Sequence, residues 1–396
     1  MGLEPGSPLA MKIEAVASHI EALSAQFASE GQARRERRNL EREDFDNLVA
    51  CGLHLTGLPV AQGGLWRSPS ANVREFASLY RTLARGDASV ALVSTMHPSV
   101  LAFWLHGHDA PPDVRDAWQQ QLADINDAVR RGQWFGTIAS EPGSNGDLMA
   151  TRASAVRDGE HWLMTGDKHM GSGSGMTSYM LTIARGVDED APDIFLMHTH
   201  EQPWDGSTGA RLVREWDGIG MQATQSHAFR FERVVVSRYA WPHHALSLAS
   251  EILPFINCLF AAVTMGILDA AMSAAHASLK GRSASMKSYE RTCWVAAENA
   301  CWLAEQALEG MLTSVENKAD ATWPAAHGKL AIAELAERCM ASIARAVGGR
   351  AYARSAPFAQ WGEDVRALGY LRPPWPLAYD NIFTQAFADT RSGPLG

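Results

Sequence analysis

The chain has 396 residues, which is enough to bury a large core and to form two or three subdomains. A formal net charge of −9, with 20% charged residues, argues against a nucleic-acid partner, because such binding needs clustered Lys and Arg. The five cysteines are scattered without CxxC spacing, so we expect buried, reduced thiols and a cytoplasmic protein. The first ten residues lack the basic start and apolar run of a signal peptide, and no apolar stretch reads as long enough to span a membrane.

The first third of the chain has a helical pattern. Apolar residues that recur every three or four positions predict an amphipathic helix over 12–27. Further helices are expected over 45–50, 73–83, 88–104 and 113–130. The segment 88–104 is nearly apolar throughout, which predicts a buried helix. We assign residues 1–131 to an N-terminal helical domain.

Strand signals dominate the middle of the chain. An apolar run over 134–140 stops at Glu141-Pro142-Gly143, and Asp158-Gly159 separates two β-rich segments as in a hairpin. A glycine-serine turn at 171–175 precedes a further strand. The remaining strands are expected over 179–184, 194–198, 211–215 and 227–236. Residues 132–242 therefore predict a β-barrel-like domain whose small-residue turns leave backbone groups open to a ligand.

The last part of the chain is again helical. Helices are expected over 253–279, 294–315 and 327–347, with a shorter one over 380–387. These four helices predict an up-down four-helix bundle within residues 243–396. The fold class is α+β, mostly α.

Two segments of the β region resemble a known family. Residues 140–147 read SEPGSNGD and residues 165–173 read TGDKHMGSG. They are similar to the flavin-facing segments T-E-P-G-x-G-S-D and N-G-x-K-x-W-I-T-N of the acyl-CoA dehydrogenase superfamily. The resemblance implies that superfamily's three-domain fold and a flavin cofactor, FAD with FMN as the alternative. It also implies a homodimer or homotetramer, because subunits of this family contribute to one another's cofactor sites.

The resemblance assigns residues to the cofactor. The isoalloxazine ring is expected against the backbone of 138–140 and against 170–172, with Met170 in place of the family's tryptophan. Arg282 matches an arginine that binds the flavin phosphate of a neighbouring subunit; the alternative is a solvated arginine at a helix end. Gly348-Gly349 matches a pair beside the dinucleotide, with a helix C-cap as the alternative. The predicted cofactor residues are Ile138, Ala139, Ser140, Gly146, Met170, Gly171, Ser172, Arg282, Gly348 and Gly349.

Two departures from the family weaken the adenine half of an FAD site. Ser285-Met286 replaces the family's Phe-Gly, and Gly146 replaces the serine of G-S-D. The flavin is therefore expected to be loosely bound FAD, or FMN.

The family's catalytic glutamate is missing. Its common position falls near Leu371-Arg372-Pro373-Pro374, and its alternative position falls near Ile256. Arg372 stays protonated, so it is expected to bind an anionic substrate or to stabilise an oxyanion or flavin hydroperoxide, unless it merely caps a helix. Glu251 and Asp380 are the nearest acids that would substitute as a base, and each also fits a solvated helix-end charge.

His97 is the first acid/base candidate, because it lies on the apolar helix expected to face the pocket; a satisfied core histidine is the alternative. No histidine pair has a third ligand at a telling spacing, so no metal site is predicted.

Three functions follow. The leading one is a reduced-flavin monooxygenase that oxidises a small organic substrate with flavin from a separate reductase. The alternatives are an acyl-CoA (or acyl-carrier) α,β-dehydrogenase with a relocated base such as Glu251, and a catalytically silent flavin-fold oligomer.

Overall fold

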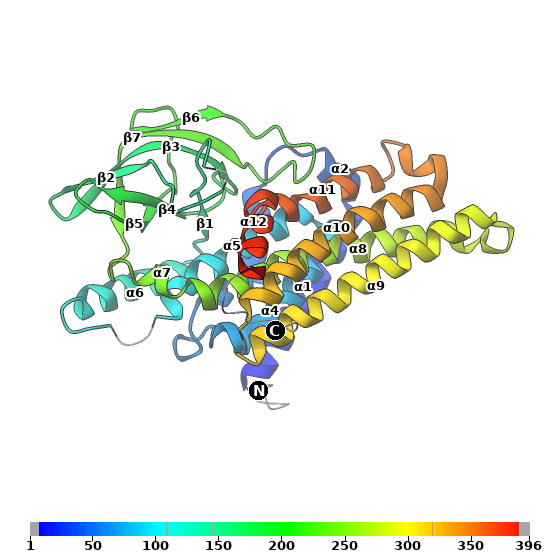
Figure 1. The fold of residues 1–396 in the computed structure, drawn as a ribbon, viewed down its shortest axis with the longest axis horizontal. Helices are drawn as coiled ribbons and strands as arrows, with labels where there is room; N and C mark the ends of the chain where they lie inside the picture. Colours follow the sequence, from blue (N-terminus) through cyan, green and yellow to red (C-terminus); the bar gives the residue numbers. More distant parts are fainter. Residues whose placement is uncertain (1–7, 108–109, 145, 319, 388–396) are drawn as a thin grey trace.

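The computed structural model describes residues 8–107, 110–144, 146–318 and 320–387. The first seven residues, where a signal peptide was not expected, and Asn145 of the first family-like segment lie outside this part. A β region sits on one end of a long helical body (Figure 1). This is the predicted α+β, mostly α architecture.

The N-terminal region is helical, as predicted. Its elements are α1 (Pro8–Ser29), α2 (Gly31–Glu36), α3 (Arg42–Ala50), the short 3-10 helices η1 (Leu53–Gly57) and η2 (Val60–Gln62), α4 (Pro69–Gly86), α5 (Ala88–Leu105) and α6 (Arg115–Arg130). Capping side chains fix the first residue of two of these helices. Ser68 accepts the amide of Ala71 at the start of α4, and Asp87 accepts that of Val90 over 3.0 Å at the start of α5.

The β region closes on itself. Its strands are β1 (Phe135–Thr137), β2 (Ser154–Asp158), β3 (His161–Gly171), β4 (Tyr179–Gly186), β5 (Pro192–His198), β6 (Ala210–Arg214) and β7 (His227–Arg238). The sheet runs β1-β4-β2-β3-β7-β5, and an additional β4–β5 pairing closes β4, β2, β3, β7 and β5 into a ring, with β1 paired to β4 and β6 paired to β7. The predicted Asp158-Gly159 hairpin is the β2–β3 turn. The result is the expected barrel-like sheet, filled by Met164, Met180, Phe195, Phe229 and Phe231.

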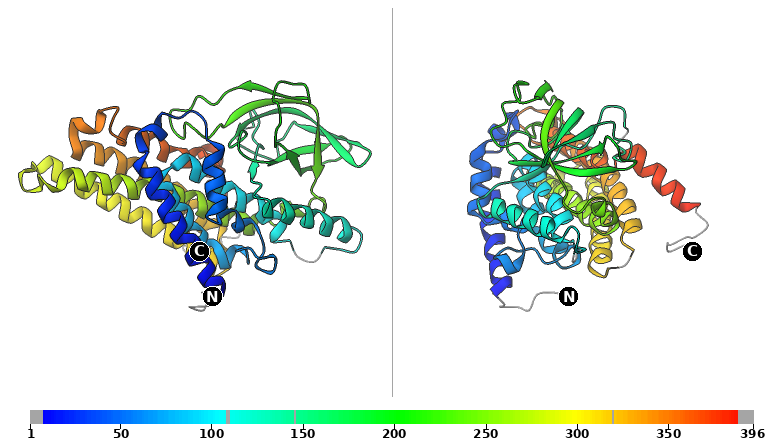
Figure 2. Two further views of the ribbon diagram at one scale, coloured as in Figure 1. Left: turned by 180° about the vertical axis from the view of Figure 1, so that it is seen from behind. Right: turned by 90° about the vertical axis from the view of Figure 1, so that its left-hand side faces the viewer.

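The C-terminal region differs from the prediction in its last helices. It contains α7 (His244–Ser247), α8 (Ala249–Lys280), η3 (Ser283–Ser285), α9 (Ser288–Glu316), α10 (Thr322–Val347), η4 (Gly348–Tyr352), α11 (Phe358–Tyr370) and α12 (Trp375–Ala386). We did not predict α11, because its glycines Gly362 and Gly369 and its charges obscure a short apolar stripe. The helix expected over 380–387 begins earlier, at Trp375. Figure 2 shows α12 leaning away from the body.

The helices before and after the barrel share one core. Buried side chains of α1, α4, α5, α8, α9, α10 and α11 belong to a single hydrophobic cluster. The division at 131 and 242 therefore stays a prediction about domains, and the two helical regions are packed together. The expectation that no stretch could span a membrane was too strict. By length and composition α5 and α8 would qualify, but 83% of each apolar window is buried inside the structure, as in core helices.

Candidate functional site

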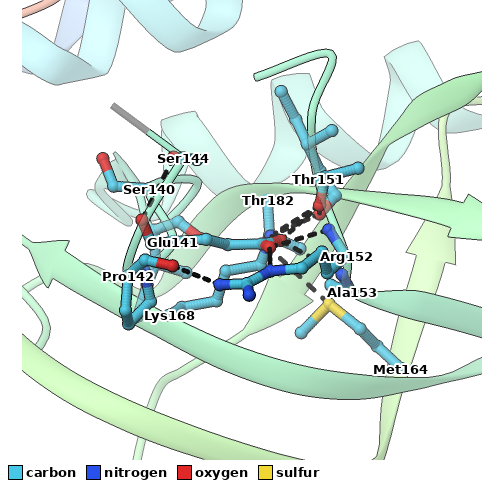
Figure 3. A network of polar contacts seen from close by, with 12 residues as sticks. Ser140, Glu141, Pro142, Ser144, Thr151, Arg152, Ala153, Met164, Lys168 and Thr182 are labelled. Carbon is cyan, nitrogen blue, oxygen red and sulfur yellow. Dashed lines mark hydrogen bonds and ion pairs between the residues drawn. The ribbon is translucent and has the colours of Figure 1, made fainter. Parts of the chain in front are cut away.

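A buried ion pair ties together the two family-like segments (Figure 3). The Lys168 Nζ lies 2.6 Å from Glu141 Oε1, and both side chains are almost completely buried. Glu141 also accepts the Arg152 amide over 2.7 Å and a hydrogen bond from the Thr151 hydroxyl. Burial alone would raise the pKa of Glu141, but the hydrogen bonds from Lys168 and Thr151 outweigh it, so the carboxyl stays ionised. The pair holds the 140–153 loop against β3.

Sequence reasoning missed this pair as a structural unit. Both residues stood within the matched segments, yet no local pattern shows that they meet. Lys168 donates as well to the Ile183 carbonyl over 2.6 Å, which anchors it to β4. The loop, β3 and β4 are thereby joined beneath the turns that were expected to face a ligand.

Arg372 reaches across to this loop from the C-terminal region. Its Nη1 donates to the Gly146 carbonyl over 3.1 Å, and its Nη2 donates to the Ser140 hydroxyl. Gly146 has φ +83°, and a Cβ there would lie 2.6 Å from Pro374 Cγ, so the glycine permits the approach of the 371–374 segment. The structure thus joins three predicted residues, Ser140, Gly146 and Arg372. The guanidinium contacts this loop and not the end of α11, which disfavours the helix-capping alternative.

The charge of Arg372 is not neutralised by a carboxylate within the described ranges, since no ion pair to it is found there. Burial lowers the pKa of Arg372 to about 10, which leaves it protonated at neutral pH. Burial is the main cause of the lowered pKa values of Lys168 and His169, and the positive charge of the nearby Arg372 lowers both further. A partly buried cation beside a hydroxyl and free of a counter-ion is a position suited to an anionic oxygen.

Met170 and Ser172 occupy the end of β3. Met170 has φ +56°, uncommon for a side chain other than glycine, and is 49% exposed. The Ser172 hydroxyl is bonded to Ser226 over 2.8 Å, and Ser226 is bonded to Thr224 over 2.7 Å. Thr224 donates its only proton to the Met221 carbonyl, so Ser226 must donate to Thr224, and Ser172 to Ser226. Ser172 is left as an acceptor towards a ligand.

The backbone of Ile138 is not open to a ligand, contrary to expectation. Its amide donates to Leu181 over 2.8 Å and its carbonyl accepts the Thr182 hydroxyl over 2.9 Å. Its side chain packs under Gly171, where a Cβ would lie 2.7 Å from Ile138 Cδ1. This geometry favours a packing role for Ile138, because the Leu181 carbonyl and the Thr182 hydroxyl already bond its backbone polar groups. Ala139 is buried beside it.

The second set of predicted cofactor residues lies elsewhere. Arg282 pairs with Glu290 at 2.5 Å and donates to the Ala346 carbonyl over 3.1 Å. Gly348, at φ +77°, ends α10, and no atom within the described chain crowds it or Gly349. Figure 1 shows the α8–α9 turn at the end of the bundle far from the barrel. The structure does not bring this set to Ser140 and Met170 within one chain.

His97 is buried and fully satisfied. The Phe135 amide donates to its Nδ1 over 3.2 Å, so Nε2 carries the proton and donates to the His54 carbonyl over 2.9 Å. Burial lowers the pKa of His97 to about 3, which keeps the ring neutral. This geometry favours the core-histidine alternative.

Glu251 is exposed on the first turn of α8 and lies 2.9 Å from His106 Nε2.

A separate cavity of about 570 Å³ lies among α8, α11 and the α4–α5 junction. It contains none of the predicted site residues. Asp364 lines it and accepts the Met221 amide over 2.6 Å. Within the described ranges, no group of three His, Cys, Asp or Glu side chains is placed to hold a metal ion.

The cluster fits a flat ligand with polar edges. Met170 offers an exposed thioether at a strand end, Ser172 offers an acceptor, and Arg372 offers a cation beside Ser140. A flavin ring presents an apolar face, an N–H and anionic or carbonyl oxygens, so these residues suit it.

Comparison with known proteins supports a flavin cofactor, although no protein-family model matches the chain. The probable FMNH2-dependent monooxygenase SfnC of Pseudomonas putida is 29% identical over 324 residues, covering 77% of this chain and 74% of SfnC. The L-evernosamine nitrososynthase of a Micromonospora species is 23% identical over 354 residues, covering 84% of this chain and 80% of that protein. The crystal structure of FMN-bound TdsC from Paenibacillus sp. A11-2 has the same fold, with a TM-score of 0.78 at 18% identity over 96% of this chain and 98% of TdsC. With the closed barrel between two helical regions and the two matched segments, these likenesses show a flavin-dependent oxidoreductase with the acyl-CoA dehydrogenase fold.

Proposed function

We propose that the protein is a monooxygenase that uses reduced FMN from a separate flavin reductase to oxidise a small organic molecule. The observation that carries the proposal is Arg372, a protonated guanidinium beside Ser140 at the position of the family's catalytic glutamate. The likeness to SfnC, named as FMNH2-dependent, supports it. Reduced flavin supplies two electrons with which O2 transfers one oxygen atom to the substrate and yields one water.

Acyl-CoA dehydrogenation is disfavoured because no carboxylate of the described ranges contacts Arg372 at the position of the family's base. A dehydrogenase must take a proton from the α-carbon, and a guanidinium with a pKa of about 10 cannot do so at neutral pH. Glu251 is exposed and bonded to His106. We therefore infer that Arg372 holds an anionic oxygen of the substrate or cofactor.

The remaining residues of the cluster hold the ring. Met170 would lie against its face, and the Ser172 hydroxyl would accept a hydrogen bond, which suits the N5–H that a reduced flavin carries and an oxidised flavin lacks. FMN is preferred over FAD because Ser285-Met286 and Gly146 replace residues that the family uses for the adenine half.

The protein is further proposed to be a homodimer or homotetramer in the cytoplasm. Arg282 lies in the α8–α9 turn and Gly348 directly follows α10. Figure 1 shows the α8–α9 turn far from the barrel, which supports a role of these residues towards the flavin phosphate of a neighbouring subunit. Large apolar side chains on α9 also point to solvent, with Val295 60% and Trp302 59% exposed. Such a row of exposed apolar groups is typical of a helix covered by another subunit.

The test uses the purified protein with FMN or FAD. Without oxygen, a panel of acyl-CoA thioesters is added while flavin absorbance is followed. With NADH, a flavin reductase and ¹⁸O2, a panel of small sulfur, nitrogen and aromatic compounds is then screened for one labelled oxygen by mass spectrometry. Single ¹⁸O incorporation is the expected result. Flavin reduction by a thioester would overturn the proposal, and failure to bind any flavin would point to the silent oligomer.

A further inference from the structure

The loop that carries Arg372 is held from behind by a buried lysine. Lys329 lies on α10 and is only 2% exposed. Its Nζ is 2.6 Å from the Leu371 carbonyl and 2.6 Å from the Pro373 carbonyl, the residues on either side of Arg372. We propose that Lys329 is a positioning residue that sets the direction of the Arg372 side chain in the site. This inference rests on the proposed function of Arg372.

An ammonium group at this place needs a reason, because burying it is costly. Burial lowers the pKa of Lys329 to about 7, and within the described ranges no carboxylate pairs with it. A packing role alone would be met better by an apolar side chain. What the loop requires is a donor. Pro373, Pro374 and Pro376 have no amide hydrogens, so the segment cannot satisfy its own carbonyls through a regular turn.

The contacts on the two sides of the loop make one connected path. Behind it, Lys329 fixes the peptide groups before and after Arg372. In front, the Arg372 guanidinium donates to Gly146 and Ser140 in the barrel. With its carbonyls released, the loop would no longer present the guanidinium in one direction. Lys329 itself reaches only backbone oxygens in the described structure, so it acts through Arg372.

A double-mutant cycle tests this path. The variants are Lys329→Met, which removes the donor at similar length, Arg372→Ala, and the two together. Lys329→Arg restores a donor that can span two carbonyls, and Lys329→Leu is a second variant without a donor in case Lys329→Met does not fold. Arg338→Met, exposed on the same helix, is the matched control. For each, the Kd for FMN is measured by fluorescence titration, kcat and KM for oxygen transfer by product formation, and Tm separately.

We expect Lys329→Met to reduce kcat/KM about tenfold or more, as for a lost hydrogen bond to a charged group, and to weaken FMN binding. Lys329→Arg should recover most of the loss, and Arg338→Met should show none. In the Arg372→Ala background, Lys329→Met should change neither quantity further, although its effect on Tm should persist.

An equal loss in both backgrounds would overturn the proposal, because Lys329 would then act independently of Arg372. Unchanged FMN affinity and kcat/KM in Lys329→Met, or in Lys329→Leu, would also overturn it. The FMN titrations separate this inference from the proposed function: a wild-type protein that binds FMN but transfers no oxygen contradicts the function, while the binding cycle still decides the role of Lys329.

Discussion

Arg372 donates a hydrogen bond of 3.1 Å to the carbonyl of Gly146, which precedes it by 226 residues in the sequence. The contact joins the segment after α11 to the loop before β2, so residues from the bundle and the barrel form one cluster. The hydroxyl of Ser140, on the same loop, accepts a hydrogen bond from the other terminal nitrogen of the guanidinium. The cation therefore sits at the predicted ligand face and not at a helix end.

Arg372→Ala should weaken FMN binding or raise KM for substrate by about tenfold or more, because hydrogen bonds to a charged group are worth about 1.5–3 kcal/mol. Arg372→Lys should recover only part of the lost affinity, because a lysine has a single nitrogen and cannot replace both guanidinium contacts, to Gly146 and to Ser140. Fluorescence titration and steady-state kinetics measure both effects. Arg366→Ala, which removes a guanidinium paired with Glu363 on α11, is the control and should match the wild type. Equal behaviour of the two alanine variants would contradict the role of Arg372.

Gly146→Ala should weaken FMN binding and lower Tm. The new Cβ would lie 2.6 Å from Pro374 Cγ at a φ of +83°, so it adds a steric clash to backbone strain of about 1–3 kcal/mol. Gly159→Ala is the matched control, because its φ is +62° but no atom lies within 4 Å of the added Cβ. If both variants lost the same stability and kept the same FMN affinity, the approach of Pro374 to Gly146 would not matter.

Glu141→Gln and Lys168→Met should each destabilise the protein by about 3–5 kcal/mol, because each leaves a buried charge without its partner. The double variant should lose less than the sum of the two. Urea unfolding monitored by circular dichroism measures these differences. Asp167→Asn breaks the neighbouring exposed pair with Arg230, whose side chains are 54% and 48% exposed, and should cost less than about 1 kcal/mol. Similar losses at Asp167 and Glu141 would contradict the importance of burial.

Ser226→Ala should favour oxidised FMN over reduced FMN. In the wild type, Ser172 gives its proton to Ser226 and can only accept from a flavin. Without that acceptor, Ser172 is able to donate to the bare N5 of oxidised flavin. The midpoint potential of bound FMN, measured by spectroelectrochemical titration, should become more negative. Ser174→Ala, whose hydroxyl bonds the Gln225 carbonyl instead, should leave it unchanged. An unchanged or more positive potential would contradict this orientation of the hydroxyls.

Asp364 predicts a pH dependence of stability. Burial raises its pKa to about 7, whereas an unfolded aspartate has a pKa near 3.9. Between these values the folded state holds a proton that the unfolded state releases, so stability falls as pH rises from about 4 to about 7. Asp364→Asn stays neutral and keeps an acceptor for the Met221 amide. When Tm is measured from pH 5 to pH 8, the difference between the Tm of Asp364→Asn and that of the wild type should increase with pH. Parallel curves of Tm against pH would contradict the raised pKa.

The sequence by itself determined most of the elements and the resemblance to one family of flavoproteins. Apolar periods of three to four residues and the Asp158-Gly159 turn depend only on neighbouring residues, so they survive without tertiary information. The two matched segments likewise predicted a flavin-facing surface at Ser140 and Met170, and the arginine at 372 removed the usual base.

Only the tertiary structure decided how these residues meet. It showed that Leu181 and Thr182 bond the backbone of Ile138. It also showed that core contacts satisfy both nitrogens of His97 and that Lys329 contacts the carbonyls on either side of Arg372. It also revealed α11, whose sequence has a weak helical signal but which packs on α8 and α10. The physical reason is the same throughout: hydrogen bonds and burial between residues that are distant in the chain depend on the packing of whole elements, and no local pattern encodes which donor will reach which acceptor.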